Sequence, residues 1–142
     1  MATAAEELLK AADDGDLAAI EAALAKGADI NARGQFGDSA LNIAAQRGHK
    51  DLAQRLLDRG ADVENVGGAD QTPLMNAAFA GNIGIVRLLL DKGAKVSDDL
   101  LMSMQMKVNI LQENAESGMV LPDAVEAWKQ FFEFLVAQRD KS

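Results

Sequence analysis

The chain has 142 residues, a formal net charge of −8 and no cysteine. The absence of cysteine excludes a disulfide framework and a thiolate metal site, and the lack of a basic patch with aromatic residues argues against nucleic-acid binding. No stretch approaches the roughly 20 apolar residues that span a bilayer, and residues 1–7 lack the pattern of a secretory signal. We therefore expect a soluble cytoplasmic protein that binds no membrane.

The negative charge is concentrated at the two ends of the chain. Residues 1–31 hold seven acidic and two basic residues, and residues 98–142 hold eight and four, whereas the middle of the chain is nearly neutral. One interpretation is that the acidic ends keep the protein soluble and prevent copies from associating end to end. The alternative is that they attract a basic partner.

Two series of glycines repeat at a spacing of 33 residues. The series are Gly15, Gly48 and Gly81, and Gly27, Gly60 and Gly93. A period in this range is typical of a solenoid, in which each repeat packs only on its neighbours.

Local signals predict a pair of helices in each repeat. The first unit offers a helix over 6–12, with Thr3 and Glu6 as a capping box. In the next two units Ser39 and Thr72 are suited to cap a first helix, and Pro73 suits the first helical position. Leucine-rich second helices are predicted over 50–58 and 83–91, each followed by a glycine suited to the left-handed position after a helix.

These residues resemble the ankyrin repeat, whose marks here are Thr72-Pro73-Leu74, the Gly48-His49 turn and the Gly60-Ala61-Asp62 exit. The resemblance is closest over 33–98, extends over 1–32 and is faint over 99–142. It implies an all-α solenoid of stacked helix-turn-helix units with β-turn loops and longer, atypical C-terminal capping helices. We expect a single domain, 1–142, made of an N-terminal capping repeat (1–32), two repeats (33–65 and 66–98) and a C-terminal cap (99–142).

Three positions depart from the family pattern. The signature histidine is Asn42 in one repeat and Met75 in the next, and in the family that histidine takes part in a hydrogen-bond network with the neighbouring helix start. Met75 cannot do so, and Asn42 is expected to do so only in part, which predicts weaker coupling between repeats. Asp70 replaces the loop glycine that Gly37 keeps, and aspartate tolerates a positive φ better than most residues.

The C-terminal segment begins with Ser97 and two acidic residues, a good helix start, and continues without a breaker from 100 to 115. One predicted face carries Leu100, Leu101, Met104, Val108 and Leu111. A second, nearly opposite face carries Met102, Met106 and Ile110. Such a helix is either sandwiched between neighbours or exposes a methionine stripe suited to adaptable contacts.

A last helix is predicted from Pro122 onwards, after a break at Gly118. Its apolar positions are Val125, Trp128, Phe131, Phe132 and Leu135. We interpret these large rings as a wedge that closes the stack, with a dimer interface as the rival interpretation.

The sequence offers little for catalysis. His49 is the only histidine and occupies the family's usual turn position, so a structural role is expected, and no common nucleophile–base pair can be assembled. Pairs such as Asp98-Asp99 lie near helix ends and serve as terminal or solvated charges. We expect no enzyme activity, no cofactor and no metal.

The resemblance implies protein recognition through the concave side, formed by loop tips and first-helix faces. Carried over by position, the partner-binding residues are Arg33, Gln35, Phe36, Asp38, Gln46, Arg47, Val66, Gly68, Ala69, Gln71, Phe79 and Ala80. A monomer that binds an unidentified protein is the main hypothesis. The alternatives are an oligomerisation role for the aromatic and methionine-rich C-terminal helices, and small-molecule binding beside them.

Overall fold

The computed structural model describes residues 2–119 and 121–141, which divide into two compact units, 1–94 and 95–142. In these described residues the regular secondary structure is helical, apart from an isolated antiparallel bridge between Arg33 and Ser39. The helices are α1 (Ala4–Asp14), α2 (Leu17–Ala25), α3 (Ala40–Arg47), α4 (Lys50–Asp58), α5 (Pro73–Ala80), α6 (Ile83–Asp91), α7 (Asp98–Glu116) and α8 (Pro122–Lys141), with one 3-10 turn, η1 (Gly68–Asp70). This confirms the predicted all-α solenoid; the single-domain organisation stays a prediction, and the second unit begins four residues before the predicted cap.

The predicted caps and helix-ending glycines of the first unit are observed, although α1 extends beyond the predicted 6–12. The hydroxyls of Thr3, Ser39 and Thr72 each accept a hydrogen bond from the amide three residues later, although only this half of the Thr3–Glu6 box is present. The helix-ending glycines of the first series have φ between 74° and 78°, and those of the second series between 88° and 93°. Side chains other than glycine rarely adopt this region, so the 33-residue glycine spacing records the turns themselves.

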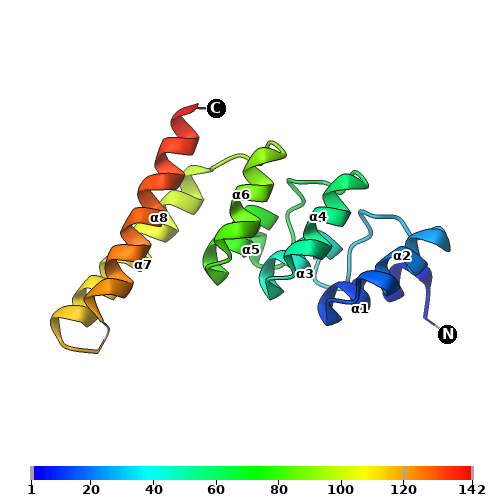
Figure 1. The fold of residues 1–142 in the computed structure, drawn as a ribbon, viewed down its shortest axis with the longest axis horizontal. Coiled ribbons are helices and arrows are strands. Elements are labelled where there is room, and N and C mark those ends of the chain that lie inside the picture. The colour runs from blue at the N-terminus through cyan, green and yellow to red at the C-terminus, as the bar shows by residue number, and fades with distance from the viewer. Residues whose placement is uncertain (1, 120, 142) are drawn as a thin grey trace. The chain divides into compact units, whose positions relative to one another are not determined.

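Equivalent residues of successive repeats form the core of residues 1–94. Leu8, Leu41 and Leu74 are at most 1% exposed, and each precedes a buried alanine pair on the same helix. The first helices α1, α3 and α5 pack side by side, and α4 packs on α6 (Figure 1). Because alanine has no side chain beyond Cβ, the pairs let neighbouring first helices approach closely, which explains the alanine-rich composition.

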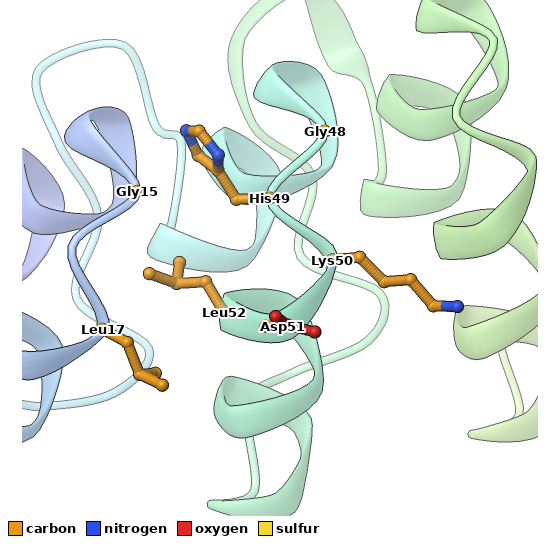
Figure 2. A pocket seen from close by; sticks show the side chains of 7 residues that line it. All are labelled: Gly15, Leu17, Gly48, His49, Lys50, Asp51 and Leu52. Carbon is orange, nitrogen blue, oxygen red and sulfur yellow. The ribbon is translucent and has the colours of Figure 1, made fainter.

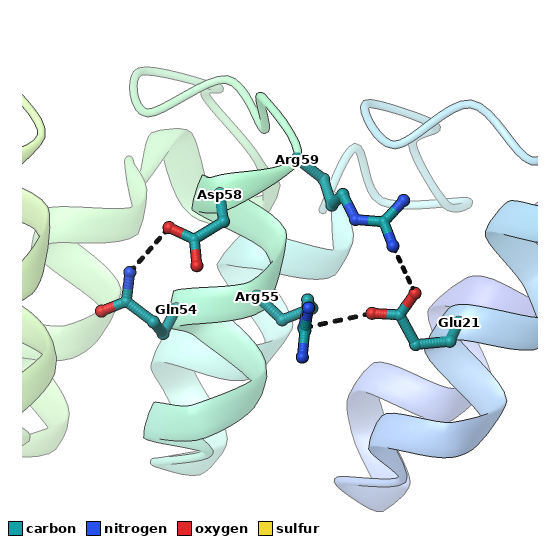
Figure 3. Close-up of polar contacts among 5 residues, drawn as sticks. All are labelled: Glu21, Gln54, Arg55, Asp58 and Arg59. Carbon is teal, nitrogen blue, oxygen red and sulfur yellow. Dashed lines mark hydrogen bonds and ion pairs between the residues drawn. The ribbon is translucent and has the colours of Figure 1, made fainter.

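Ion pairs join the second helices, and Figure 3 shows those between α2 and α4. Glu21 Oε2 of α2 accepts a hydrogen bond from Arg59 Nη2 at 2.7 Å, and Glu21 Oε1 forms an ion pair with Arg55 Nε at 3.1 Å. Asp58 then meets Lys92 Nζ at 3.7 Å and accepts a hydrogen bond from Gln54. These side chains are substantially exposed, so each pair contributes little to stability, at most about 1 kcal/mol. Part of the acidic charge of the first repeat is nevertheless neutralised by the next repeat.

A buried polar network joins the second and third repeats through Asn42, whose side chain is fully buried. Asn42 Oδ1 accepts hydrogen bonds from Ser39 at 2.9 Å and from Asn65 Nδ2 at 2.7 Å. Asn42 Nδ2 lies within hydrogen-bonding distance of the Asn65 and Gln71 carbonyls and of Asn76 Oδ1, the last at 2.8 Å. The expectation that Asn42 takes only a partial role is therefore wrong. An amide carries both donors and acceptors, so it connects the two repeats where Met75 does not.

The second unit is a hairpin of α7 and α8, which pack on each other. Ser97 caps α7, Gly118 follows its end with φ 79°, and Pro122 begins α8, all as predicted. The ring of Trp128 lies 5.8 Å from that of Phe131, and Lys107 Nζ lies 3.9 Å from the Trp128 ring centre. The wedge and dimer interpretations of these rings both stay predictions.

The sandwiched interpretation of α7 is wrong. On its first face Leu100, Met104 and Val108 are buried. On the second face Met102 and Met106 are 70% and 65% exposed. The alternation of two apolar faces reflects one buried side and one side open to solvent.

Removing the buried amide should weaken the repeat stack. We predict that Asn42→Ala lowers the free energy of unfolding by about 3 kcal/mol, because several buried donors and acceptors lose their partner. Chemical denaturation followed by circular dichroism measures this change. Asn109→Ala is the matched control, since Asn109 is exposed on α7, and it should cost less than about 0.5 kcal/mol. If Asn42→Ala lowers the free energy of unfolding by less than about 1 kcal/mol, the network does not make the proposed contribution to stability.

Candidate partner-binding surface

Two adjacent loop tips are tied together by side chains of the first. The guanidinium of Arg33 donates to the Gly37 carbonyl at 2.9 Å and to the Val66 carbonyl at 2.8 Å. Asp38 Oδ1 accepts a hydrogen bond from the Gly68 amide at 2.9 Å. Charged groups make stronger hydrogen bonds than neutral ones. The two tips are therefore held as one surface.

The second tip contains two residues in the left-handed region, Ala69 with φ 59° and Asp70 with φ 58°. The positive φ predicted at Asp70 is confirmed. Ala69 was not expected to share it, because nothing in the residue type signals it. An alanine in this region costs about 1–2 kcal/mol, so the tip stores strain that neighbouring hydrogen bonds hold in place.

The largest exposed apolar side chain of the tips is Phe36, which is 78% exposed. Val66 on the next tip is 45% exposed, and Gln35 and Ala69 are also exposed. The backbone and Cβ of Phe36 lie close to Gly68, where an added Cβ would be 3.6 Å from that of Phe36. Thus Phe36 of the first tip lies beside Gly68 of the second.

The helix residues assigned to the surface differ in exposure. Gln46 and Ala80 are exposed, whereas Phe79, the register equivalent of Gln46, is half-buried. Arg47 is exposed but pairs with Asp13 of the first repeat, with Nε 2.8 Å from Oδ1.

Several residues predicted to contact a partner make hydrogen bonds within the protein. Arg33 and Asp38 connect the tips, and the Gln71 side chain accepts a hydrogen bond from Asn76 at 2.8 Å. Asn65 and Asn76 belong to this framework and were missed by sequence reasoning. For Asn76, a signal was present in the sequence. Both first helices carry an asparagine in the first turn, Asn42 and Asn76, which differ by one residue from the 33-residue register.

A groove of about 430 Å³ lies where the turns of the first two repeats meet (Figure 2). Its lining residues are Gly15, Leu17, Gly48, His49, Lys50, Asp51 and Leu52. Figure 2 shows the Lys50 side chain extending away from His49.

His49 serves as a link between turns. Its Nε2 lies 3.3 Å from the Asp13 carbonyl, and its ring lies so close to Gly15 that an added Cβ there would be 2.7 Å away. In the next repeat Asn82 holds the equivalent position, and its Nδ2 donates to the Ala45 carbonyl at 2.8 Å. Two different side chains at equivalent positions thus each reach a carbonyl near the end of the preceding repeat's first helix, which supports the structural role expected for His49.

Residues 2–119 and 121–141 contain no cluster of three or more potential metal-ligating side chains. No helix in these ranges has the length and apolar character needed to cross a membrane.

The comparisons with known proteins agree with the geometry. Residues 8–99 match the model of the family described as ankyrin repeats (3 copies), which is well over half of the chain. The chain belongs to the ankyrin repeat family. Members of this family are generally protein–protein interaction modules and typically not enzymes.

Two relatives come from Rickettsia felis. The chain is 40% identical over 47 residues to "Putative ankyrin repeat protein RF_p14", a match that covers 33% of this chain and 75% of the relative. It is likewise 40% identical over 47 residues to "Putative ankyrin repeat protein RF_pd14", covering 33% and 71%.

The strain at the second tip can be tested by a single substitution. We predict that Ala69→Gly raises the free energy of unfolding by about 0.5–1 kcal/mol, because glycine adopts the left-handed region without a Cβ penalty. Ala22→Gly, at an exposed site inside α2, is the matched control and should lower it by about 1 kcal/mol. Chemical denaturation of both variants measures whether the free energy of unfolding rises for Ala69→Gly and falls for Ala22→Gly. An equal loss for both would mean that Ala69 is not held in the left-handed region.

Proposed function

We propose that this protein binds a partner protein through a tip face. The tip face consists of Gln35, Phe36, Val66 and Ala69 at the loop tips and Gln46, Phe79 and Ala80 on the first helices. One observation carries the proposal: Phe36 is 78% exposed on a loop that Arg33 and Asp38 hold in place.

A rigid exposed ring is well suited to recognition. Aromatic residues are enriched at the centres of protein interfaces and account for much of their binding energy. Ordering a mobile loop on binding costs free energy, and the bonds between the two tips reduce that cost in advance. The ring is therefore presented at low entropic cost to a complementary pocket.

The charges near the tips favour a partner with an apolar contact surface. Arg33 and Asp38 donate to and accept from backbone groups within the protein, and Arg47 is paired with Asp13. The outward groups that remain on the tip face are neutral. Specificity would then come from shape and apolar contacts, with Arg47 at the rim, more than from strong charge pairing.

We further propose that the protein acts as a cytoplasmic monomer, without enzyme activity, cofactor or nucleic acid. These features remain predictions. The proposal of a monomer is supported by the net charge of −8, because like charges oppose association of copies.

The tip face is tested by replacing its two rings. We predict that Phe36→Ala/Phe79→Ala keeps the fold within about 1 kcal/mol, because one ring is exposed and the other half-buried. The same variant should weaken partner binding by about 2 kcal/mol or more. The partner is captured with immobilised wild-type protein, and its affinity for each variant is then measured by calorimetry.

The matched control is Ile83→Ala, since Ile83 is an exposed apolar residue of the same unit outside the tip face. It should bind the partner like the wild type. A double variant that folds and binds normally would exclude the tip face as the recognition site. Loss of folding would show that these rings belong to the core.

A further inference from the structure

A row of exposed apolar side chains runs along α7. Met102, Met106 and Ile110 are 70%, 65% and 51% exposed. Their spacing of four residues places them on one side of the helix along about 12 Å. We call these three residues the Met face.

The hairpin does not use the Met face for its own core. The opposite side of α7 supplies Leu100, Met104 and Val108, which are all buried. Single exposed apolar residues are ordinary, whereas contiguous exposed apolar patches are typical of interaction sites. Methionine is flexible and polarisable, so two of the three side chains adapt readily to the shape of a partner.

Acidic side chains surround the Met face. At 100° per residue, Asp99 and Glu113 fall within about 20° of the midline of the row, one at each end, and Glu116 flanks the row about 80° from that midline. The only cation of α7, Lys107, lies over the Trp128 ring instead. With the described residues, none of the three carboxylates forms an ion pair.

The placement of Glu113 and Glu116 is unfavourable for the helix itself. Both lie near the C-terminal end of α7, where the last turn holds no basic residue. The helix dipole favours cations at this end and disfavours carboxylates. Their contribution to stability is thus negative, and a cationic ligand would reverse it.

We propose that the Met face binds a basic amphipathic helix of another protein. Apolar anchors at i, i+3 or i+4, and i+7 of such a helix would lie on Met102, Met106 and Ile110. Lysine or arginine residues beside these anchors would meet Asp99, Glu113 and Glu116. This site is independent of the tip face.

The charges favour a different protein over a second copy of this chain. Two copies of α7 placed face to face would bring acidic groups against acidic groups in a protein with a net charge of −8. Like charges opposed across an interface are destabilising. A basic helix removes that repulsion and gains attraction instead.

The test uses the full chain and a fluorescein-labelled Leu/Lys peptide of about 18 residues, with leucines at helical spacing, about 27 Å long as a helix. The first comparison peptide has the same composition in scrambled order. The second has Glu in place of every Lys. Fluorescence anisotropy measures each dissociation constant at low and high salt. We expect the helical Leu/Lys peptide to bind at least about ten-fold more tightly than either comparison peptide, with an affinity that falls as salt screens the charges.

Two double variants separate the apolar and the charged contributions. Met102→Gln/Met106→Gln should weaken binding of the Leu/Lys peptide roughly ten-fold. Its matched control, Ile83→Gln/Met119→Gln, changes two exposed apolar residues outside the row and should bind like the wild type. Glu113→Gln/Glu116→Gln should bind several-fold more weakly and with a smaller salt dependence, yet melt no lower than the wild type, because it removes an unfavourable dipole interaction.

Glu126→Gln/Glu133→Gln removes the same charge from exposed sites of α8 and serves as the second control. Equal losses for both charge variants would mean that the peptide responds only to net charge, and would overturn the proposal. Equal binding of the scrambled peptide would do the same. A wild-type dimer in sedimentation equilibrium that Met102→Gln/Met106→Gln converts to monomer would assign the Met face to a second copy instead.

Discussion

A buried amide that water cannot reach must find its partners within the protein, and Asn42 finds them where two repeats meet. Its oxygen accepts from its own helix start and from Asn65, and its nitrogen lies near acceptors of the following repeat. Leaving such groups unpaired costs far more than forming the bonds gains. These hydrogen bonds therefore fix the position of the third repeat relative to the second. The neighbouring loop tips, and with them the proposed tip face, depend on that position.

Most of the backbone of this protein could be predicted from its sequence because local rules specify it. Hydroxyl caps, a proline at a first helical position and glycines at a regular spacing each act within a few residues of the turn that they determine. The second helices accordingly lie at the predicted residues, 50–58 and 83–91. The network around Asn42 could not be predicted in this way, because its partners lie 23 to 34 residues away.

The candidate surface was harder to predict than the fold, since the direction of a side chain does not follow from its spacing. Arg33 and Asp38 are of the types that often contact a partner, but here they bind the neighbouring loop. Phe36 and Phe79 were assigned to one exposed face, and only the first is largely exposed. In α7 the sequence pattern revealed two apolar faces. Which face is covered depends on how α7 packs against α8, and this tertiary contact cannot be read from the spacing of residues within α7.

The links between the repeats of the first unit are unequal in kind. Between the first and second repeats they are exposed, as in Arg47 with Asp13 and Arg59 with Glu21. Between the second and third repeats some links are exposed, as in Asp58 with Lys92, but those of Asn42 with Asn76 and of Asn82 with Ala45 are buried or partly buried. In a stack where each repeat touches only its neighbours, opening can start at an end and stop at a strong junction. The N-terminal repeat would therefore fray first, and its amides would exchange with solvent while the two repeats that carry the tip face remain folded.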